Sequence, residues 1–176
     1  MATKSKPELA VSAEDVAESP AVREALMMLD EDCTVPRAVT VELEDYARKL
    51  SEISVPTSYN VAKAGTKVHT AVSTALAVRT RLPMLYVKLN RILVKLSTVE
   101  EAVFVACLKT PEVAAATVQW RRDALVAKAM QQVHAKQRRV KLCLSQCEEL
   151  RAGFDAVVTA VDTMTRAHYA VKGQDE

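Results

Sequence analysis

Four cysteines and three histidines are the side chains of this sequence most suited to metal binding or nucleophilic chemistry. Cys143 and Cys147 are four residues apart, so a helix places both thiols on one face, where two thiolates can share a metal. No second pair of ligands and no nearby histidine accompanies them in the sequence, whereas structural zinc needs four ligands. Free cysteine is also among the most frequently buried residue types. We therefore predict buried free thiols, no metal and no cofactor.

The histidines do not form a catalytic pattern. His69 and His134 fall on outward positions of the apolar repeats described below, and His168 lies near the end of the second repeat. Nucleophilic catalysis needs side chains that converge in a concave site, which parallel stripes on helices do not provide. The three glycines form no phosphate-binding loop. We therefore predict that the protein is not an enzyme.

Two long apolar repeats organise the chain. Apolar residues recur at alternating steps of three and four from Val61 to Ala106, and the same spacing continues from Val126 to Val171. A repeat of 3.5 residues that is kept over about six heptads is typical of a coiled coil. One helix cannot bury its own stripe, so each repeat needs a partner helix from this chain or from another. We predict an all-α, elongated coiled-coil protein with two long heptad helices that are separated by a break at Thr110-Pro111.

The larger apolar residues of both repeats form the predicted partner-binding seam. They are Val61, Val68, Val78, Leu82, Leu85, Leu89, Ile92, Leu96, Val99 and Val103 in the first repeat, and Val126, Val133, Val140, Leu150, Phe154, Val157, Val161 and Met164 in the second. Lys136 occupies a seam position of the second repeat although it is charged. It either fixes the register of the paired helices or extends out of the seam toward solvent. Flanking apolar residues such as Leu76, Tyr86 and Phe104 widen the first repeat, as expected of a helix that contacts more than one neighbour.

The net charge of +2 conceals a strong asymmetry. Residues 1–56 carry 6 basic and 12 acidic side chains, whereas residues 57–110 carry 8 basic and 2 acidic ones. Lys67, Arg81, Lys88 and Lys95 occupy g positions of the first repeat, where charges select coiled-coil partners. Either the acidic N-terminal part neutralises the basic helix within the chain, or an acidic helix of another chain does so. Partners are thus expected to be helical and acidic, in a homo- or hetero-oligomer.

Turn and capping signals predict the boundaries of the segments. Ser19-Pro20 predicts the start of a short helix that ends near Leu29, and Thr40 is expected to cap a second helix that ends near Ile53. The predicted segments are a disordered polar tail at 1–18, short helices and linkers at 19–56, a basic coiled-coil helix at 57–109, a second one at 111–172 and a tail at 173–176.

Two prolines decide the path of the long helices. Pro83 lies on an outward position of the first repeat, which continues in phase, so we expect a kink rather than a break. Pro111 allows two arrangements. If the chain reverses there, the two helices form an antiparallel hairpin; if the path is only kinked, the seams of a longer rod face other subunits.

No membrane-spanning run and no signal peptide is found in the sequence, so we expect a soluble, cytoplasmic protein, with peripheral attachment to an organelle or the cytoskeleton as an option. The basic run from Lys136 to Lys141 is either a solvated helix face or a patch for nuclear import or an anionic surface.

Four short elements occur in an order that resembles a known family. They are Glu44-Asp45-Tyr46, Tyr59, Leu89-Asn90-Arg91-Ile92 and Val99-Glu100-Glu101-Ala102, and they resemble subunit 2 of the lysosome-related-organelle biogenesis complex over about residues 44–108. Some spacings differ by one residue, and the helix after Pro111 extends beyond the family's pattern. The resemblance implies a non-enzymatic subunit of a hetero-oligomeric helical assembly in lysosome positioning or endosomal trafficking.

Two other functional classes fit the composition. A cytoskeletal or chromosome-segregation protein would use the basic helix on microtubules or nucleic acid. A self-contained helical bundle with an internal ligand site would be a stable monomer when it is purified alone.

Overall fold

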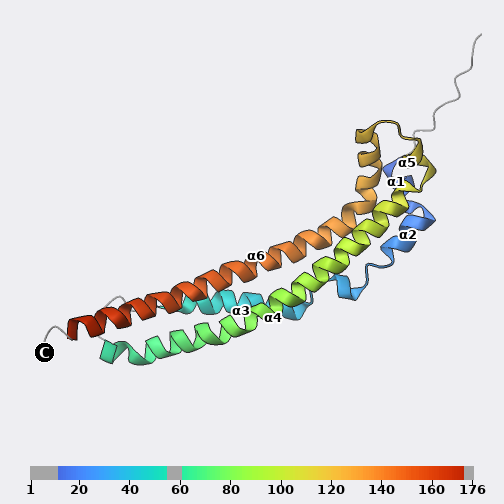
Figure 1. The fold of residues 1–176 in the computed structure, drawn as a ribbon. Coiled ribbons are helices and arrows are strands. Elements are labelled where there is room, and N and C mark those ends of the chain that lie inside the picture. The colour runs from blue at the N-terminus through green and yellow to red at the C-terminus, as the bar shows by residue number, and fades with distance from the viewer. Residues whose placement is uncertain (1–11, 55–60, 173–176) are drawn as a thin grey trace, which may run out of the picture. The chain divides into compact units, whose positions relative to one another are not determined.

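A computed structural model of the chain describes residues 12–54 and 61–172 (Figure 1). These residues are about 89% helical and include no strand, so the predicted all-α class is confirmed. The two longest helices are α4 (Val61–Leu108) and α6 (Gln119–Lys172). The shorter elements are α1 (Ala13–Glu18), α2 (Pro20–Leu26), the 3-10 turn η1 (Glu31–Cys33), α3 (Arg37–Glu52) and α5 (Pro111–Ala115).

The chain divides into two compact units, each assembled from separate segments. Unit 1 combines Met1–Thr34 with Leu93–Arg138, and unit 2 combines Val35–Ile92 with Arg139–Glu176. Both α4 and α6 contribute to each unit, so neither unit is a continuous stretch of sequence.

In unit 2, α4 and α6 run antiparallel. Arg79 Nε lies 3.2 Å from Asp155 Oδ1, an ion pair without hydrogen-bond geometry. One heptad further along α4, the Tyr86 hydroxyl donates a hydrogen bond of 3.4 Å to Glu148, which is one heptad earlier in α6. The contact moves forward along α4 as it moves backward along α6, which is the antiparallel arrangement that the hairpin alternative requires.

Unit 2 also contains α3, which lies alongside both long helices (Figure 1). Val39, Leu43 and Tyr46 recur on one side of α3 at helical spacing, and all three side chains are buried. Gly153 of α6 faces Leu50 of α3 so closely that a Cβ at Gly153 would collide with the leucine side chain. The absence of a side chain there permits the close approach of the two helices.

In unit 1 the same two helices also run antiparallel (Figure 1). Glu100 of α4 receives a 2.5 Å hydrogen bond from the Gln137 amide of α6 and lies 3.1 Å from His134 Nε2. The N-terminal elements complete this unit through Val16 of α1 and Val22 of α2, which are both fully buried.

The N-terminal boundaries differ from the prediction in three places. Residues 13–18, which were expected to be disordered, form α1, because Ser12 and Asp15 make a reciprocal capping box. The helix expected to extend to Leu29 starts at Pro20 as predicted but ends at Leu26. The next helix starts at Arg37, where Pro36 is the N-cap, and not after Thr40, whose hydroxyl donates to the Arg37 carbonyl instead.

The prediction of one helix over residues 111–172 is wrong. A short helix, α5, ends at Ala115, and α6 begins at Gln119. The Thr110 hydroxyl does not cap α5 but donates 2.7 Å to the Cys107 carbonyl at the end of α4. The Arg122 Nε donates 2.6 Å to the Ala116 carbonyl and thereby satisfies an acceptor in the turn. By contrast, Pro83 lies within α4 without ending it, as predicted.

Candidate partner-binding surface

The predicted seam is buried within the chain. From Val78 to Val103 in the first repeat and from Val126 to Val161 in the second, every predicted apolar seam residue is buried. Val68 and Met164 are half-buried, and the Val61 side chain lies outside the described residues. These seam side chains are therefore covered by other parts of the same chain. That another chain binds directly to these seam residues stays a prediction.

The two flanks of the α4 seam face different neighbours. The e positions Arg79 and Tyr86 contact α6 in unit 2, and Glu100 contacts α6 in unit 1. Two g positions, Arg81 and Lys95, face the acidic N-terminal part instead. Arg81 Nε lies 3.3 Å from Glu42 in unit 2, and Lys95 Nζ lies 2.5 Å from Asp32 in unit 1. The N-terminal part therefore takes the place that a coiled-coil partner's acidic residues were expected to fill.

The remaining predicted cations have different environments. Lys67 and Lys88 are exposed and form no ion pair with any residue that the structure describes. Lys136 is half-buried, and its ammonium leaves the seam to donate 2.7 Å to the Thr34 hydroxyl. This geometry corresponds to the alternative in which the lysine extends outward.

Gln137 is a buried polar residue that the heptad spacing does not predict. It is adjacent to Lys136, only 8% exposed, and its amide is satisfied by Glu100 of the facing helix. Only a hydrogen-bonded polar group is tolerated at such a position, so this pair favours one register of α4 against α6. The heptad spacing places Gln137 beside the seam, which is why its burial was not evident from the pattern.

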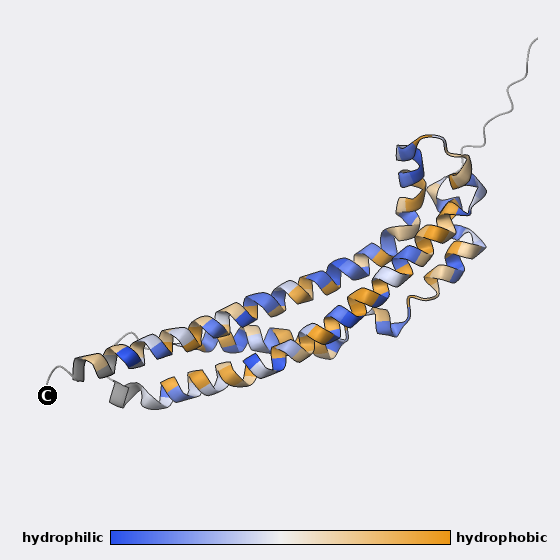
Figure 2. Ribbon diagram, viewed as in Figure 1, coloured by the Kyte–Doolittle hydropathy of each residue, from blue (hydrophilic) through white to orange (hydrophobic). Residues whose placement is uncertain are grey.

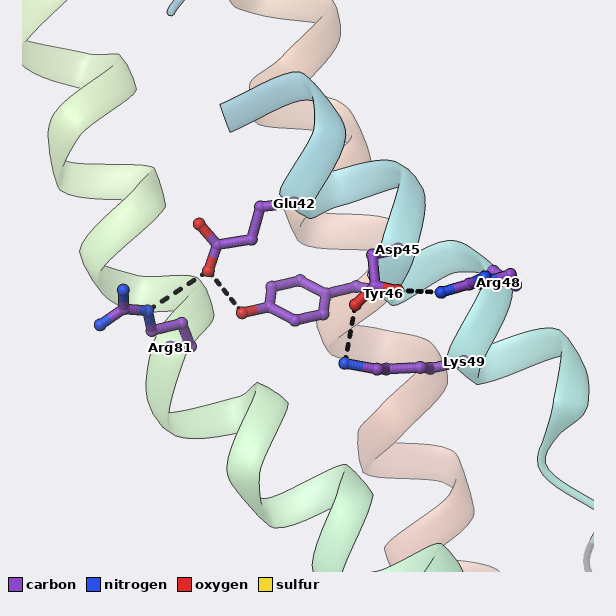
Figure 3. Close-up of polar contacts among 6 residues, drawn as sticks. All are labelled: Glu42, Asp45, Tyr46, Arg48, Lys49 and Arg81. Carbon is purple, nitrogen blue, oxygen red and sulfur yellow. Dashed lines mark hydrogen bonds and ion pairs between the residues drawn. The ribbon is translucent and has the colours of Figure 1, made fainter. Parts of the chain in front are cut away.

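Glu42 connects α3 to α4 (Figure 3). Its Oε1 atom accepts a 2.5 Å hydrogen bond from the Tyr46 hydroxyl and also lies 3.3 Å from Arg81 Nε. Burial, followed by the hydrogen bond to Glu42, raises the pKa of Tyr46 to about 12. On the outward side of α3, Asp45 pairs with Arg48 and Lys49, and hydrogen bonds from both lower its pKa. Of these contacts, the Arg81–Glu42 pair joins α3 to α4, whereas the others lie within α3.

The cysteines are free and buried, as predicted. Burial raises the pKa of Cys107 and Cys143, and it raises the pKa of Cys147 to about 11. Since the thiolate is the reactive and metal-binding form, these thiols are poorly suited to nucleophilic chemistry at neutral pH. No cluster of three or more metal-binding side chains occurs among the described residues.

His69 and His134 have different surroundings. His134 pairs with Glu100, His69 is exposed, and the His168 side chain lies outside the described residues.

In the part of the chain that the structure describes, no helix has both the length and the apolar character needed to cross a membrane.

An exposed apolar cluster lies in unit 1. Seven consecutive apolar residues, 102–108, span about two turns at the end of α4, so apolar side chains leave the helix in every direction. Figure 2 shows hydrophobic colours along this end of α4. Val103, Ala106 and Cys107 are buried on one side, while Phe104, Val105 and Leu108 remain 45%, 41% and 44% exposed on the other. Met28, which follows α2, borders the same shallow groove as Val105 and is also exposed. We call Met28, Phe104, Val105 and Leu108 the unit 1 apolar patch.

A second exposed apolar surface lies on α4 in unit 2. Leu76, Pro83, Met84 and Val87 lie opposite the buried seam and are exposed. The shallow groove between α3 and α6 is less open to a partner, because its floor residues Leu43 and Leu150 are buried.

Comparison of this chain with protein-family models, curated proteins and solved structures finds no match.

Proposed function

We propose that this protein is a non-enzymatic scaffold or adaptor subunit of a hetero-oligomeric helical complex. In this proposal α4 and α6 form an antiparallel coiled-coil hairpin, and other helical chains bind to its outer surfaces. The heptad spacing and the antiparallel contacts within each unit support the hairpin. Its seam then stabilises the subunit itself, and partner recognition belongs to the residues that the hairpin leaves exposed.

The observation that carries the proposal is the unit 1 apolar patch. A helix that is apolar all round is normally buried all round, yet one side of residues 102–108 faces solvent. Exposed apolar clusters on soluble proteins commonly mark interaction sites, and the aromatic ring of Phe104 and the flexible Met28 are side chains suited to that use.

We further propose that the complex acts in lysosome or endosome trafficking, on the strength of the resemblance at Glu44-Asp45-Tyr46 and Leu89-Asn90-Arg91-Ile92. The alternative, a microtubule- or nucleic-acid-binding protein, rests on the basic character of α4. The pairing of Arg81 with Glu42 and of Lys95 with Asp32 favours the helical-partner proposal, because these two cations are already neutralised within the chain.

The proposal is tested by disrupting the patch without disturbing the fold. Phe104→Glu combined with Leu108→Glu introduces two charges at exposed positions, so circular dichroism and the unfolding midpoint are expected to change little. In a native pull-down of the tagged full-length protein, we expect several small helical proteins at near-stoichiometric yield, and at least about a tenfold loss of them in the variant.

Leu142→Glu is the matched control, because Leu142 is 61% exposed on a helix face rich in charged and polar residues. It should retain every partner. If the patch variant also retains them, the unit 1 apolar patch does not recruit the partners. If the protein is recovered alone, the scaffold proposal is wrong. Recovery of tubulin or nucleic acid that is lost at higher salt would favour the alternative.

A further inference from the structure

The α4 helix of unit 2 has two apolar faces. One is the buried seam, and the other consists of Leu76, Pro83, Met84 and Val87, which we call the outer face of α4. Met84 is 61% exposed and Val87 is 50% exposed, whereas Leu82 and Leu89 on the seam are almost completely buried. A helix with a single neighbour needs one apolar stripe, so the second stripe needs its own explanation.

The neighbours of α4 within unit 2 lie on its flanks and do not cover the outer face. Arg79 and Tyr86 contact α6 on one flank, and Arg81 contacts α3 on the other. The outer face lies between these flanks on the far side from the seam, and its side chains remain exposed. It is therefore accessible to another chain while both internal contacts are kept.

The exposed side of α6 in the same unit has a different composition. Between Lys141 and Thr159 its exposed residues are charged, polar or small, with Leu142 as the exception. This is the usual composition of a helix surface in contact with water. The apolar outer face of α4 is thus specific to that helix.

Positive charge surrounds the outer face. The sequence contains no Asp or Glu between Glu52 and Glu100. Lys88 and Arg91 border the outer face, are exposed, and form no ion pair with any described residue. An approaching chain therefore meets an apolar stripe with two exposed cations at its edge, neither of which is paired within the described part of the chain.

We propose that the outer face of α4 binds an amphipathic helix of another protein whose apolar stripe is flanked by Asp and Glu. This inference rests on the proposed function and defines the chemistry of one partner. The partner's apolar side chains cover Met84 and Val87, and its carboxylates pair with Lys88 and Arg91. A basic or neutral helix leaves these two cations desolvated without a counter-charge, which opposes its binding.

A second copy of this chain is a poor occupant of the same surface. In a two-fold symmetric contact the same patch meets itself, so Lys88 and Arg91 of one copy approach Lys88 and Arg91 of the other. No acidic residue on this part of α4 relieves that repulsion, because the nearest acids in the sequence of the helix are Glu100 and Glu101.

The test is site-specific photo-crosslinking in the full-length protein. The photoreactive residue p-benzoylphenylalanine replaces Val87, the protein is irradiated in the cells that express it naturally, and mass spectrometry identifies the crosslinked peptide. We expect a peptide of a different protein with a heptad apolar repeat and a net negative charge. Adding Lys88→Glu and Arg91→Glu should lower the crosslink yield several-fold. The same photoreactive residue at Leu142 is the control and should give only background.

A crosslink to a second copy, to a basic segment or to an acidic segment without an apolar heptad repeat overturns the inference. A Val87 yield no higher than the Leu142 background, or a yield that does not change in the charge-reversal variant, overturns it as well. The combined Phe104→Glu and Leu108→Glu variant separates this inference from the proposed function. If that variant loses the partners while Val87 gives no crosslink, only the present inference fails; partner recovery that does not depend on Phe104 counts against the proposed unit 1 patch.

Discussion

The Arg81 Nε atom of α4 lies 3.3 Å from the Glu42 Oε1 atom of α3, and the same oxygen accepts the Tyr46 hydroxyl. The basic residues of α4 were predicted to be neutralised either by the acidic N-terminal part or by an acidic helix of another chain, and Arg81 pairs with the N-terminal part. Lys95 pairs with Asp32 in the same way within unit 1. Intramolecular neutralisation thus explains part of the charge asymmetry of the sequence.

The Arg81–Glu42 ion pair is expected to make only a small contribution to stability. Both side chains are partly exposed, so the pair should contribute only about 0.5–1 kcal/mol to the free energy of unfolding. A double-mutant cycle with Arg81→Ala and Glu42→Gln measures it by urea denaturation, since glutamine retains an acceptor for Tyr46. Strictly additive effects of the two substitutions would show that the pair does not stabilise unit 2.

The ionisation of Tyr46 provides a prediction about pH. Its pKa is raised from 10.0 to about 12 in the folded protein, so its contribution to stability is complete below pH 10 and is lost as the pH rises toward 12. Ultraviolet titration should show a tyrosine component that ionises late, and Tyr46→Phe should remove that component. A late component that persists in Tyr46→Phe would assign the shift to another tyrosine.

Truncation of the seam should destabilise the subunit itself. Leu89 is fully buried, so Leu89→Ala is expected to lower the free energy of unfolding by about 2–5 kcal/mol, through lost burial and the cavity that remains. The exposed control Leu142→Ala should cost no more than about 0.5 kcal/mol. Equal effects in the purified protein would contradict the internal burial of the seam.

The close approach of α3 to α6 depends on Gly153. A methyl group at this position meets the flexible end of Leu50, which can rotate away, but a leucine cannot be accommodated in the same way. Gly153→Leu should therefore reduce hydrogen-exchange protection of α3 by the equivalent of about 1–3 kcal/mol while the α4–α6 pair stays protected. Ala152→Leu, at the exposed neighbouring position, is the control and should leave α3 protected.

The seam was predictable because burial follows the heptad spacing closely. Leu85, Leu89 and Phe154 were predicted from their positions alone, and all three are buried. The neighbour of each flank was not predictable, since a g-position cation such as Arg81 attracts any acidic segment, and spacing cannot distinguish an internal segment from another chain.

The differences between the predicted and the observed helix boundaries have causes in short stretches of the chain. Ser12 and Asp15 have the spacing of a capping box and could have indicated the start of α1. The polar composition of residues 1–18 led instead to the prediction of a disordered tail. The interruption before Gln119 has no glycine or proline to announce it, and it depends on contacts such as that of Arg122 with the Ala116 carbonyl. The apolar run 102–108, which includes most of the unit 1 apolar patch, is visible in the sequence. Which side of the helix stays exposed depends on how the helices pack.

The most direct test of the account is whether α4 and α6 pair within one chain. Arg79→Cys and Asp155→Cys place two reactive thiols at a contact of unit 2, while the native cysteines are buried. Light and heavy isotope-labelled proteins are mixed unfolded, refolded together and treated with a bismaleimide that spans about 10 Å. As a control, Leu142→Cys replaces Asp155→Cys, because it lies about 20 Å away along α6 at 1.5 Å per residue. We predict crosslinks between positions 79 and 155 that join peptides of the same label only. A statistical mixture of light–heavy crosslinks would show that the seams pair between chains, and it would contradict the hairpin.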